Sequence, residues 1–247
     1  MLKLIKLEIK KFKLNKNVKT VMIINLIILA VLLLGVYSLK FNTKENMFRN
    51  YSDVFLYTGT IVRATFSIFA AALISKLIIG EYKSKTINIM FSYPIKRKNI
   101  MAAKLAIVVI FAFTTMILSN IFLIFSIYLL NIFANFIQIP LTQDILVKNL
   151  INIFVYSATF SFVSLIPLYI GMRKKSGSAT IITSIILVNL LNNGSNGNTL
   201  SSIIIIPIIL AIIGVFVAYL SIKDIEKVDV TTRSEEHTSE LQSPPLS

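Results

Sequence analysis

Residues able to do chemistry are few in this chain. It contains no cysteine, one histidine at position 237, and 11 acidic against 25 basic side chains. Without cysteine there is neither a thiolate metal ligand nor a thiol nucleophile. The H-E-x-x-H pattern of zinc proteases and the G-x-S-x-G pattern of serine hydrolases do not occur either. We therefore expect no catalytic residue, no metal and no cofactor in this chain.

One short segment combines charged and apolar residues at helical spacing. Glu81 and Lys85 are four residues apart, so they can pair on one face of a helix. An apolar stripe at i, i+3 and i+4 lies on another face: Ile87, Met90 and Phe91. Pro94 ends the segment. The pattern predicts a small amphipathic helix for a soluble partner, and on spacing alone a basic loop lying on anionic lipid is an equal alternative.

The elements that position this segment are hydrophobic. The chain is 55% hydrophobic with a mean hydropathy of +0.79, well above a soluble domain. A membrane-crossing helix needs roughly 20 apolar residues. Six stretches approach or exceed that length: 20–39, 62–79, 103–130, 150–171, 176–191 and 200–220. We expect an all-α polytopic membrane protein whose six transmembrane helices form a single domain over residues 1–230.

Lysine and arginine predict the orientation. Eighteen of them lie in the N-terminal segment, between the second and third stretches, between the fourth and fifth, and after the sixth, while five lie on the opposite side. The basic side is cytoplasmic, so both termini and the segment from Glu81 to Pro94 should face the cytoplasm. Lipid headgroups explain the net charge of +14, and no nucleic-acid partner is expected.

The two ends of the chain differ in character. Near the N-terminus, apolar residues recur at helical spacing opposite the lysines, which predicts a helix in the membrane interface, with a solvated basic tail as the alternative. At the other end we expect a disordered tail over 231–247. From Arg233 onward it resembles a translated sequencing adapter, so 233–247 is excluded from fold reasoning, together with His237.

Few polar groups interrupt the predicted spans. No Asp or Glu occurs in any of them, which argues against a proton- or sodium-coupled carrier. Arg63 and Lys76 lie near opposite ends of the second span, where snorkelling to the headgroups is expected of both. Pro167 and Pro207 should kink the fourth and sixth spans.

The loop after the second span resembles the ABC-2 permease family, the membrane subunits of bacterial ABC exporters. The shared pattern is a Glu after the span, Lys-Thr, an apolar stretch, Ser-x-Pro, a basic cluster and a Lys-Leu entering the third span. Many relatives have Gly-Thr where this chain has Lys85-Thr86. The matching residues are Glu81, Lys85, Thr86, Ile89, Met90, Ser92, Pro94, Ile95, Arg97, Ile100, Lys104 and Leu105.

The resemblance implies that this loop is a cytoplasmic coupling helix seated in a cleft of a separate ABC ATP-binding subunit, which carries ATP and Mg. It implies a polar contact for Glu81 and membrane anchoring by Arg97. The partner-binding set is Glu81, Lys85, Thr86, Ile87, Met90, Phe91, Pro94 and Arg97. Six spans form half a pore, so a second permease protomer, identical or different, is expected in the bacterial plasma membrane.

Two functional hypotheses follow. The first is an ABC exporter permease similar to the bacteriocin, lantibiotic or bacitracin immunity and resistance transporters, moving an amphipathic or lipid-like substrate such as an antimicrobial peptide or antibiotic. Short outer loops favour such a cargo. The alternative is a non-transporting membrane sensor or immunity protein, in which the loop after Gly80 only touches headgroups.

Overall fold

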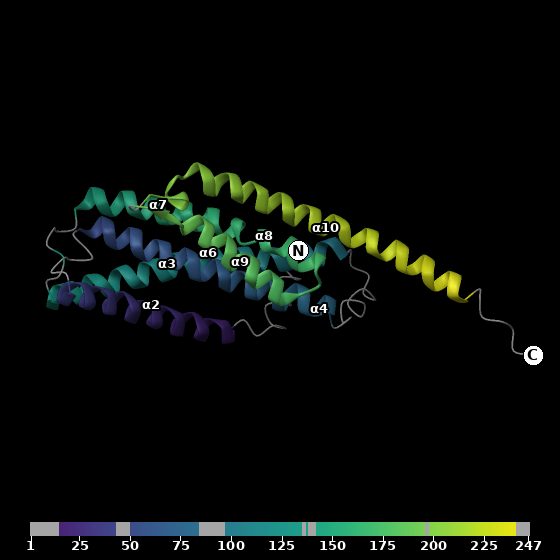
Figure 1. Ribbon diagram of the computed structural model, residues 1–247, viewed down its shortest axis with the longest axis horizontal. Coiled ribbons are helices and arrows are strands. Elements are labelled where there is room, and N and C mark those ends of the chain that lie inside the picture. The colour runs from purple at the N-terminus through teal and green to yellow at the C-terminus, as the bar shows by residue number, and fades with distance from the viewer. Residues whose placement is uncertain are drawn as a thin grey trace, which may run out of the picture.

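The computed structural model describes residues 15–42, 50–83, 97–134, 137, 142–195 and 198–240. Within these residues the chain is almost entirely helical (Figure 1). The helices are α2 (Asn15–Asn42), α3 (Tyr51–Ile74), the π-helix η1 (Ser75–Ile79), α4 (Gly80–Lys83), α6 (Arg97–Ala134), α7 (Gln143–Val163), α8 (Ile166–Arg173), α9 (Gly177–Asn192), the 3-10 turn η2 (Leu200–Ser202) and α10 (Ile205–Glu240). Two-residue strands β1 (Gly194–Ser195) and β2 (Asn198–Thr199) pair antiparallel.

Five helical segments are long and apolar enough to cross a membrane. They are Asn17–Tyr37, Tyr51–Ile79, Lys98–Phe133, Gln143–Arg173 and Ile205–Lys223. The sixth apolar helix, α9, is shorter, with 16 residues. The long helices run side by side along the bundle (Figure 1). The predicted all-α polytopic fold is thereby confirmed, whereas the predicted interfacial helix (residues 1–14) and coupling helix (84–96) lie outside the described residues.

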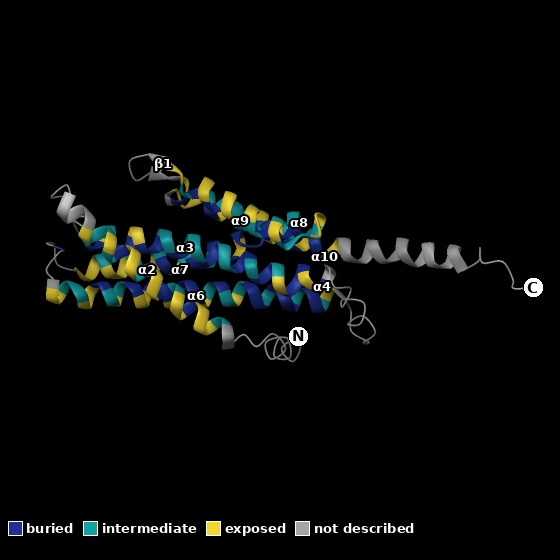
Figure 2. Cartoon of the chain, turned by 60° about the horizontal axis from the view of Figure 1, so that its bottom comes forward, coloured by how far each residue is buried: buried dark blue, intermediate teal, exposed yellow. Residues whose placement is uncertain are grey.

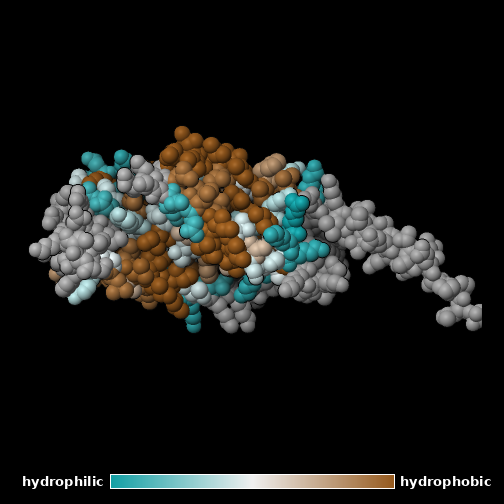
Figure 3. All heavy atoms as spheres, in the orientation of Figure 1, coloured by the Kyte–Doolittle hydropathy of each residue, from teal (hydrophilic) through white to brown (hydrophobic). Residues whose placement is uncertain are grey.

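The surface of the bundle is what a bilayer requires. Large apolar side chains are exposed along α2, α6, α9 and α10; on α2 and α10, Leu34 and Ile212 are 68% and 66% exposed. Figure 3 shows hydrophobic residues spread over the middle of one face. Such exposure would destabilise a protein in water, but hydrocarbon is a good solvent for these side chains. The chain is a multi-pass membrane protein.

Helix α3 is the centre of the bundle. It packs against α6, α7 and α9, and buried positions follow it from Val54 to Ile74 (Figure 2). Two apolar clusters share it: one includes Phe66 and Met116, and the other surrounds Leu77 in η1. Because α3 is enclosed, any polar side chain that points inward from it must find its partners within the protein.

The π-helix η1 widens the end of α3 where α8 and α9 come very close. A Cβ added to Gly177 would collide with the Ser75 hydroxyl, and one on Gly171 would collide with the side chains of Thr180 and Ile79. Glycine at these two positions lets the helices approach to backbone distance. These close contacts hold η1, α8 and α9 together at the end of the bundle where α4 begins.

The second span begins earlier than the sequence predicted. Its first eleven residues, before Val62, include Asp53 and several hydroxyl residues, so a hydropathy criterion excluded them. The structure starts the helix at Tyr51, where Asn50 accepts a hydrogen bond from the Asp53 amide in a capping box. Asp53, and Asp144 in α7, therefore lie in first turns of the spanning helices, where a helix N-terminus favours negative charge.

The two predicted kinks have different outcomes. The fourth span is interrupted at Ser164–Leu165, and α8 restarts with Pro167 in its first turn. Pro207 lies in the sixth span as predicted, but this span begins only at Ile205, so the proline sits in the first turn of α10. A proline in the first turn sacrifices no intrahelical hydrogen bond, so no kink results.

Helix α10 also extends further than expected. The sequence predicted disorder from residue 231, whereas the structure continues α10 to Glu240, past the end of the bundle (Figure 1). A long preceding helix and the absence of proline before Pro244 make this continuation sterically free. The assignment of 233–247 to a sequencing adapter stays a prediction.

Hydroxyl groups inside the bundle mostly serve their own helices. Ser126, Thr159 and Thr183 each donate to a carbonyl four residues earlier. Among the described residues, a bond between spans comes from the Ser184 hydroxyl of α9, which donates to the Ser67 carbonyl of α3 at 3.3 Å. Carbonyls of the same helix are nearer than those of another helix, so these hydroxyls need no partner helix.

Candidate functional site

A buried ion pair joins the end of the second span to the start of the third. Glu81 lies in α4, directly after η1, and Lys104 lies in the second turn of α6. The two side chains form a salt bridge and are 10% and 4% exposed. Lys104 Nζ also donates to the Leu77 carbonyl of η1 at 3.0 Å. The ammonium group thus bridges an acidic side chain and the helix backbone that precedes it.

The surroundings of this pair are apolar. Leu77, Met101 and Leu105 belong to the same cluster, and each is at most 5% exposed. A charge in such a place is tolerated only with a partner, and removing one partner leaves the other uncompensated. Glu81 and Lys104 therefore hold α4 against α6 at the point where residues 84–96 leave and rejoin the described structure.

The structure thus places few of the predicted site residues. Glu81 is described and is paired within the chain, so its contact with an ATP-binding subunit stays a prediction. Arg97 is the first residue of α6, but its side chain is not described. The other predicted residues lie outside the described part of the chain: Lys85, Thr86, Ile87, Met90, Phe91 and Pro94.

Comparisons with known proteins show the family to which this chain belongs. A family model described as "ABC-2 family transporter protein" matches residues 4–192. The chain belongs to the ABC-2 family. A curated relative from Bacillus subtilis (strain 168), "Uncharacterized protein YcbO", is 39% identical over 226 residues, which is 92% of this chain and 99% of the relative. No solved structure matches this chain.

Membership of the ABC-2 family makes the chain a permease-type component of a membrane transporter, and such components generally work with an ATP-binding subunit. The resemblance based on the loop residues is confirmed at the level of the family. Sequence reasoning had also noted Lys104 at the start of the third span, but gave it no role. The signal for such a role was its position. A lysine buried one helical turn inside an apolar span needs an anionic partner, and Glu81 comes two residues after the end of the preceding span.

Arg63 of the ABC-2 permease lies elsewhere than predicted. With the helix starting at Tyr51, this arginine is well inside the second span. It points inward, with its guanidinium carbon 4.6 Å from the ring centre of Tyr156 and 5.4 Å from that of Phe160. The expectation that Arg63 snorkels to the headgroups is wrong, because neighbouring aromatic rings of α7 hold the side chain in the bundle.

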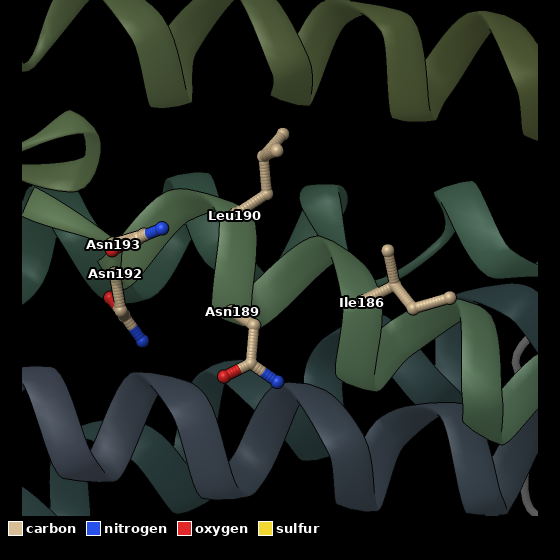
Figure 4. Close-up of a pocket in the computed structure, with 5 residues that line it drawn as sticks. All are labelled: Ile186, Asn189, Leu190, Asn192 and Asn193. Carbon is tan, nitrogen blue, oxygen red and sulfur yellow. The ribbon is translucent and has the colours of Figure 1, made fainter.

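Two pockets lie on the permease surface. One, of 610 Å³, is lined by α9 residues, and Figure 4 shows Asn189 and Asn192 pointing to one side of this helix and Leu190 to the other. The second, of 640 Å³, is an apolar groove between α7 and α10 that includes Phe162 and Phe216. An apolar groove in this position suits acyl chains, whereas the asparagines offer only neutral hydrogen bonds.

Proposed function

We propose that this chain is the permease subunit of an ABC exporter and that a separate ATP-binding subunit drives it. Family membership supports the permease role. The observation that carries the coupling mechanism is the buried bridge between Glu81 and Lys104, because it ties together the two helices that flank residues 84–96. A force applied to that loop then moves both spans as a unit.

The proposed cycle has the following parts. Two ATP-binding subunits bind ATP and Mg, and each receives the loop of one permease protomer, with the apolar stripe Ile87, Met90 and Phe91 in its cleft. Closure of the ATP-binding subunits pushes the loops and tilts the second and third spans. The permease itself supplies no cofactor. Two protomers, identical or different, enclose the transport path in the bacterial plasma membrane, with both termini in the cytoplasm.

The proposed cargo is amphipathic or lipid-like, an antimicrobial peptide or antibiotic being one such class. Exposed apolar side chains and the groove between α7 and α10 favour a molecule that arrives through the bilayer. Within the described residues no long segment lies outside the bundle on the side of β1 and β2 that could capture a hydrophilic substrate from solution.

Co-purification tests the proposal. The permease is expressed with a candidate ATP-binding subunit of an ABC transporter from the same organism, and the complex is isolated by a tag on the permease. Alanine at Ile87, Met90 and Phe91 should release the ATP-binding protein while the permease stays monodisperse. Alanine at Met22, Ile23 and Leu26, which are exposed on α2, is the matched control and should leave the complex intact.

Two results would argue for the alternative. An unchanged complex after the loop substitutions would remove the coupling role. A permease that never binds the ATP-binding protein, yet protects cells against a membrane-active peptide, would support a non-transporting sensor or immunity protein. Vesicles containing the intact complex distinguish transport directly, because only an exporter accumulates a labelled amphipathic peptide when ATP is added.

A further inference from the structure

A polar cavity lies inside the bundle, at a distance from Glu81 and Lys104. It has a volume of 330 Å³ and lies between α3, α6 and α7. It is lined from Ser52, in the first turn of α3, down to Arg63, and on α7 by Lys148 and Asn152. Eleven residues of helix make the distance from Ser52 to Arg63 about 16 Å. The cavity therefore reaches from the end of the bundle where α3 and α7 begin into the membrane interior.

Arg63 presents its donors to this cavity. Its ring contacts with Tyr156 and Phe160 hold the guanidinium plane, and Nη2 donates to the Thr60 hydroxyl at 3.0 Å. The buried Nε has no hydrogen-bond partner among the described residues. A guanidinium carries five N–H donors in a planar fork that suits an oxyanion. The guanidinium is thus held in place while at least its Nε–H donor is available to a ligand.

Its neighbours keep the space open. A Cβ on Gly59 would lie 3.2 Å from Arg63 Nη1 and 3.8 Å from the Asn120 side-chain oxygen, so glycine leaves room beside the guanidinium. That oxygen is buried and also has no hydrogen-bond partner among the described residues. An oxygen cannot accept from an oxyanion, but it can accept from a hydroxyl or an ammonium group of the same ligand.

The charged residues that line the cavity are cationic. Arg63 and Lys148 line it, and none of the described lining residues has a carboxylate. Along α3 the described carboxylate is Asp53, ten residues from Arg63 and about 15 Å away along the helix. A cation in a low-dielectric interior is costly without an anion. The described carboxylates Asp53 and Asp144 lie in the first turns of α3 and α7, on the same side as the exposed Lys148, so the positive charge without a nearby carboxylate is that of Arg63 at the base.

We infer that this cavity binds an oxyanion, the phosphate or carboxylate headgroup of an amphipathic molecule, with Arg63 as its principal ligand. The volume of 330 Å³ equals that of about eleven water molecules at roughly 30 Å³ each, which accommodates a phosphate and part of its hydration. The surrounding apolar surface takes the acyl chains. This inference goes beyond the proposed coupling to ATP hydrolysis and does not depend on it.

Binding of radiolabelled dioctanoyl phosphatidic acid to the purified full chain in a neutral detergent tests the inference. Saturable binding is expected, and dioctanoylglycerol, which has the same tails without the phosphate, should not compete. Arg63→Gln should weaken binding roughly tenfold or more, because a hydrogen bond to a charged group is lost. Arg63→Lys keeps the charge and should retain part of the binding.

The control is Lys76→Gln, which removes a charge from the same span at an exposed position away from the cavity. It should bind phosphatidic acid as the unmodified chain does. If Arg63→Gln does not yield monodisperse protein, Asn152→Leu takes its place, because it fills the cavity wall and leaves Arg63 intact. Asn152→Leu should cause the same loss of binding.

Competition by inorganic phosphate identifies the source of the anion. Arg63-dependent binding that free phosphate displaces assigns the site to a free oxyanion, and binding that only phosphatidic acid displaces assigns it to a headgroup. Both results support an oxyanion site. Equal binding by Arg63→Gln and the unmodified chain, an equal loss in Lys76→Gln, or equal competition by dioctanoylglycerol would overturn it. Since no ATP-binding subunit is present, none of these outcomes bears on the proposed coupling.

Discussion

Glu81 and Lys104 are 23 residues apart in the sequence and form a buried salt bridge between α4 and α6. Lys104 is also bonded to the Leu77 carbonyl, so the bridge reaches η1. The pair closes the base of the segment 84–96, which the family resemblance associates with an ATP-binding partner. It gives this ABC-2 permease a fixed mechanical connection between its second and third spans.

Breaking this pair on one side should destabilise the protein strongly. Glu81→Gln or Lys104→Gln leaves one buried charge unpaired, with an expected loss of roughly 3–5 kcal/mol in the free energy of unfolding. Replacing both, as Glu81→Gln with Lys104→Gln, should cost less than the sum of the single changes. Thermal unfolding in detergent measures the three variants. Lys174→Gln, an exposed lysine, is the control and should change stability by about 0.5 kcal/mol or less. Strictly additive losses would show that the two charges are independent.

The predicted orientation can be tested by labelling, because the chain has no cysteine. Ser92→Cys, in the predicted cytoplasmic loop, should be protected from a membrane-impermeant maleimide in intact cells and react after permeabilisation. Asn46→Cys, between the first two spans, should react in intact cells. The physical reason is the asymmetry of Lys and Arg across the membrane. Labelling of Ser92→Cys from outside would invert the topology and remove the proposed coupling.

Close packing between α7 and α10 depends on Gly214. A Cβ at this position would collide with the backbone carbonyl of Phe162, and a backbone atom cannot move aside cheaply. Gly214→Ala should therefore lower the free energy of unfolding by about 1–3 kcal/mol through overpacking. Gly80→Ala is the matched control, since its nearest neighbour, the Ser75 carbonyl, is 3.5 Å from the added Cβ. A melting temperature unchanged by Gly214→Ala would mean that α10 is free to shift away from α7.

Removal of residues 233–247 should have no effect. The sequence assigns this segment to a sequencing adapter, and it lies beyond the part of α10 that is apolar enough to span the membrane, which ends at Lys223. The truncated chain should show the same melting temperature and retain the same amount of ATP-binding protein in co-purification. A measurable loss of either would demonstrate that the segment belongs to the working protein.

The membrane class and most of the spans were predictable because each depends on local composition. A helix in hydrocarbon satisfies its own backbone, so a run of apolar residues is enough to locate it. Hydropathy does not locate the start of the second span, where Asp53 and nearby hydroxyl residues lower the mean hydropathy. A capping box and burial against α6 and α7 stabilise the helix there. That error moved Arg63 from the interior to the predicted membrane surface.

The ion pair at the loop base was half visible in the sequence. Glu81 was selected for its place after the second span, and Lys104 was part of the family pattern, but their pairing requires α4 and the start of α6 to lie next to each other in space. The cavity around Arg63 was not visible at all. It is lined from three helices, and the ring stacking that holds the guanidinium comes from Tyr156 and Phe160 on α7.

By itself, the sequence determined that the chain is a helical membrane protein, because bilayer hydrophobicity is a property of each segment alone. It also indicated the ABC-2 family through residues of one loop. Only the tertiary structure decided which polar side chains meet inside the bundle. Contacts between segments that are distant in sequence decide which buried charges and hydrogen-bond donors have a partner in the protein. No local pattern specifies those contacts.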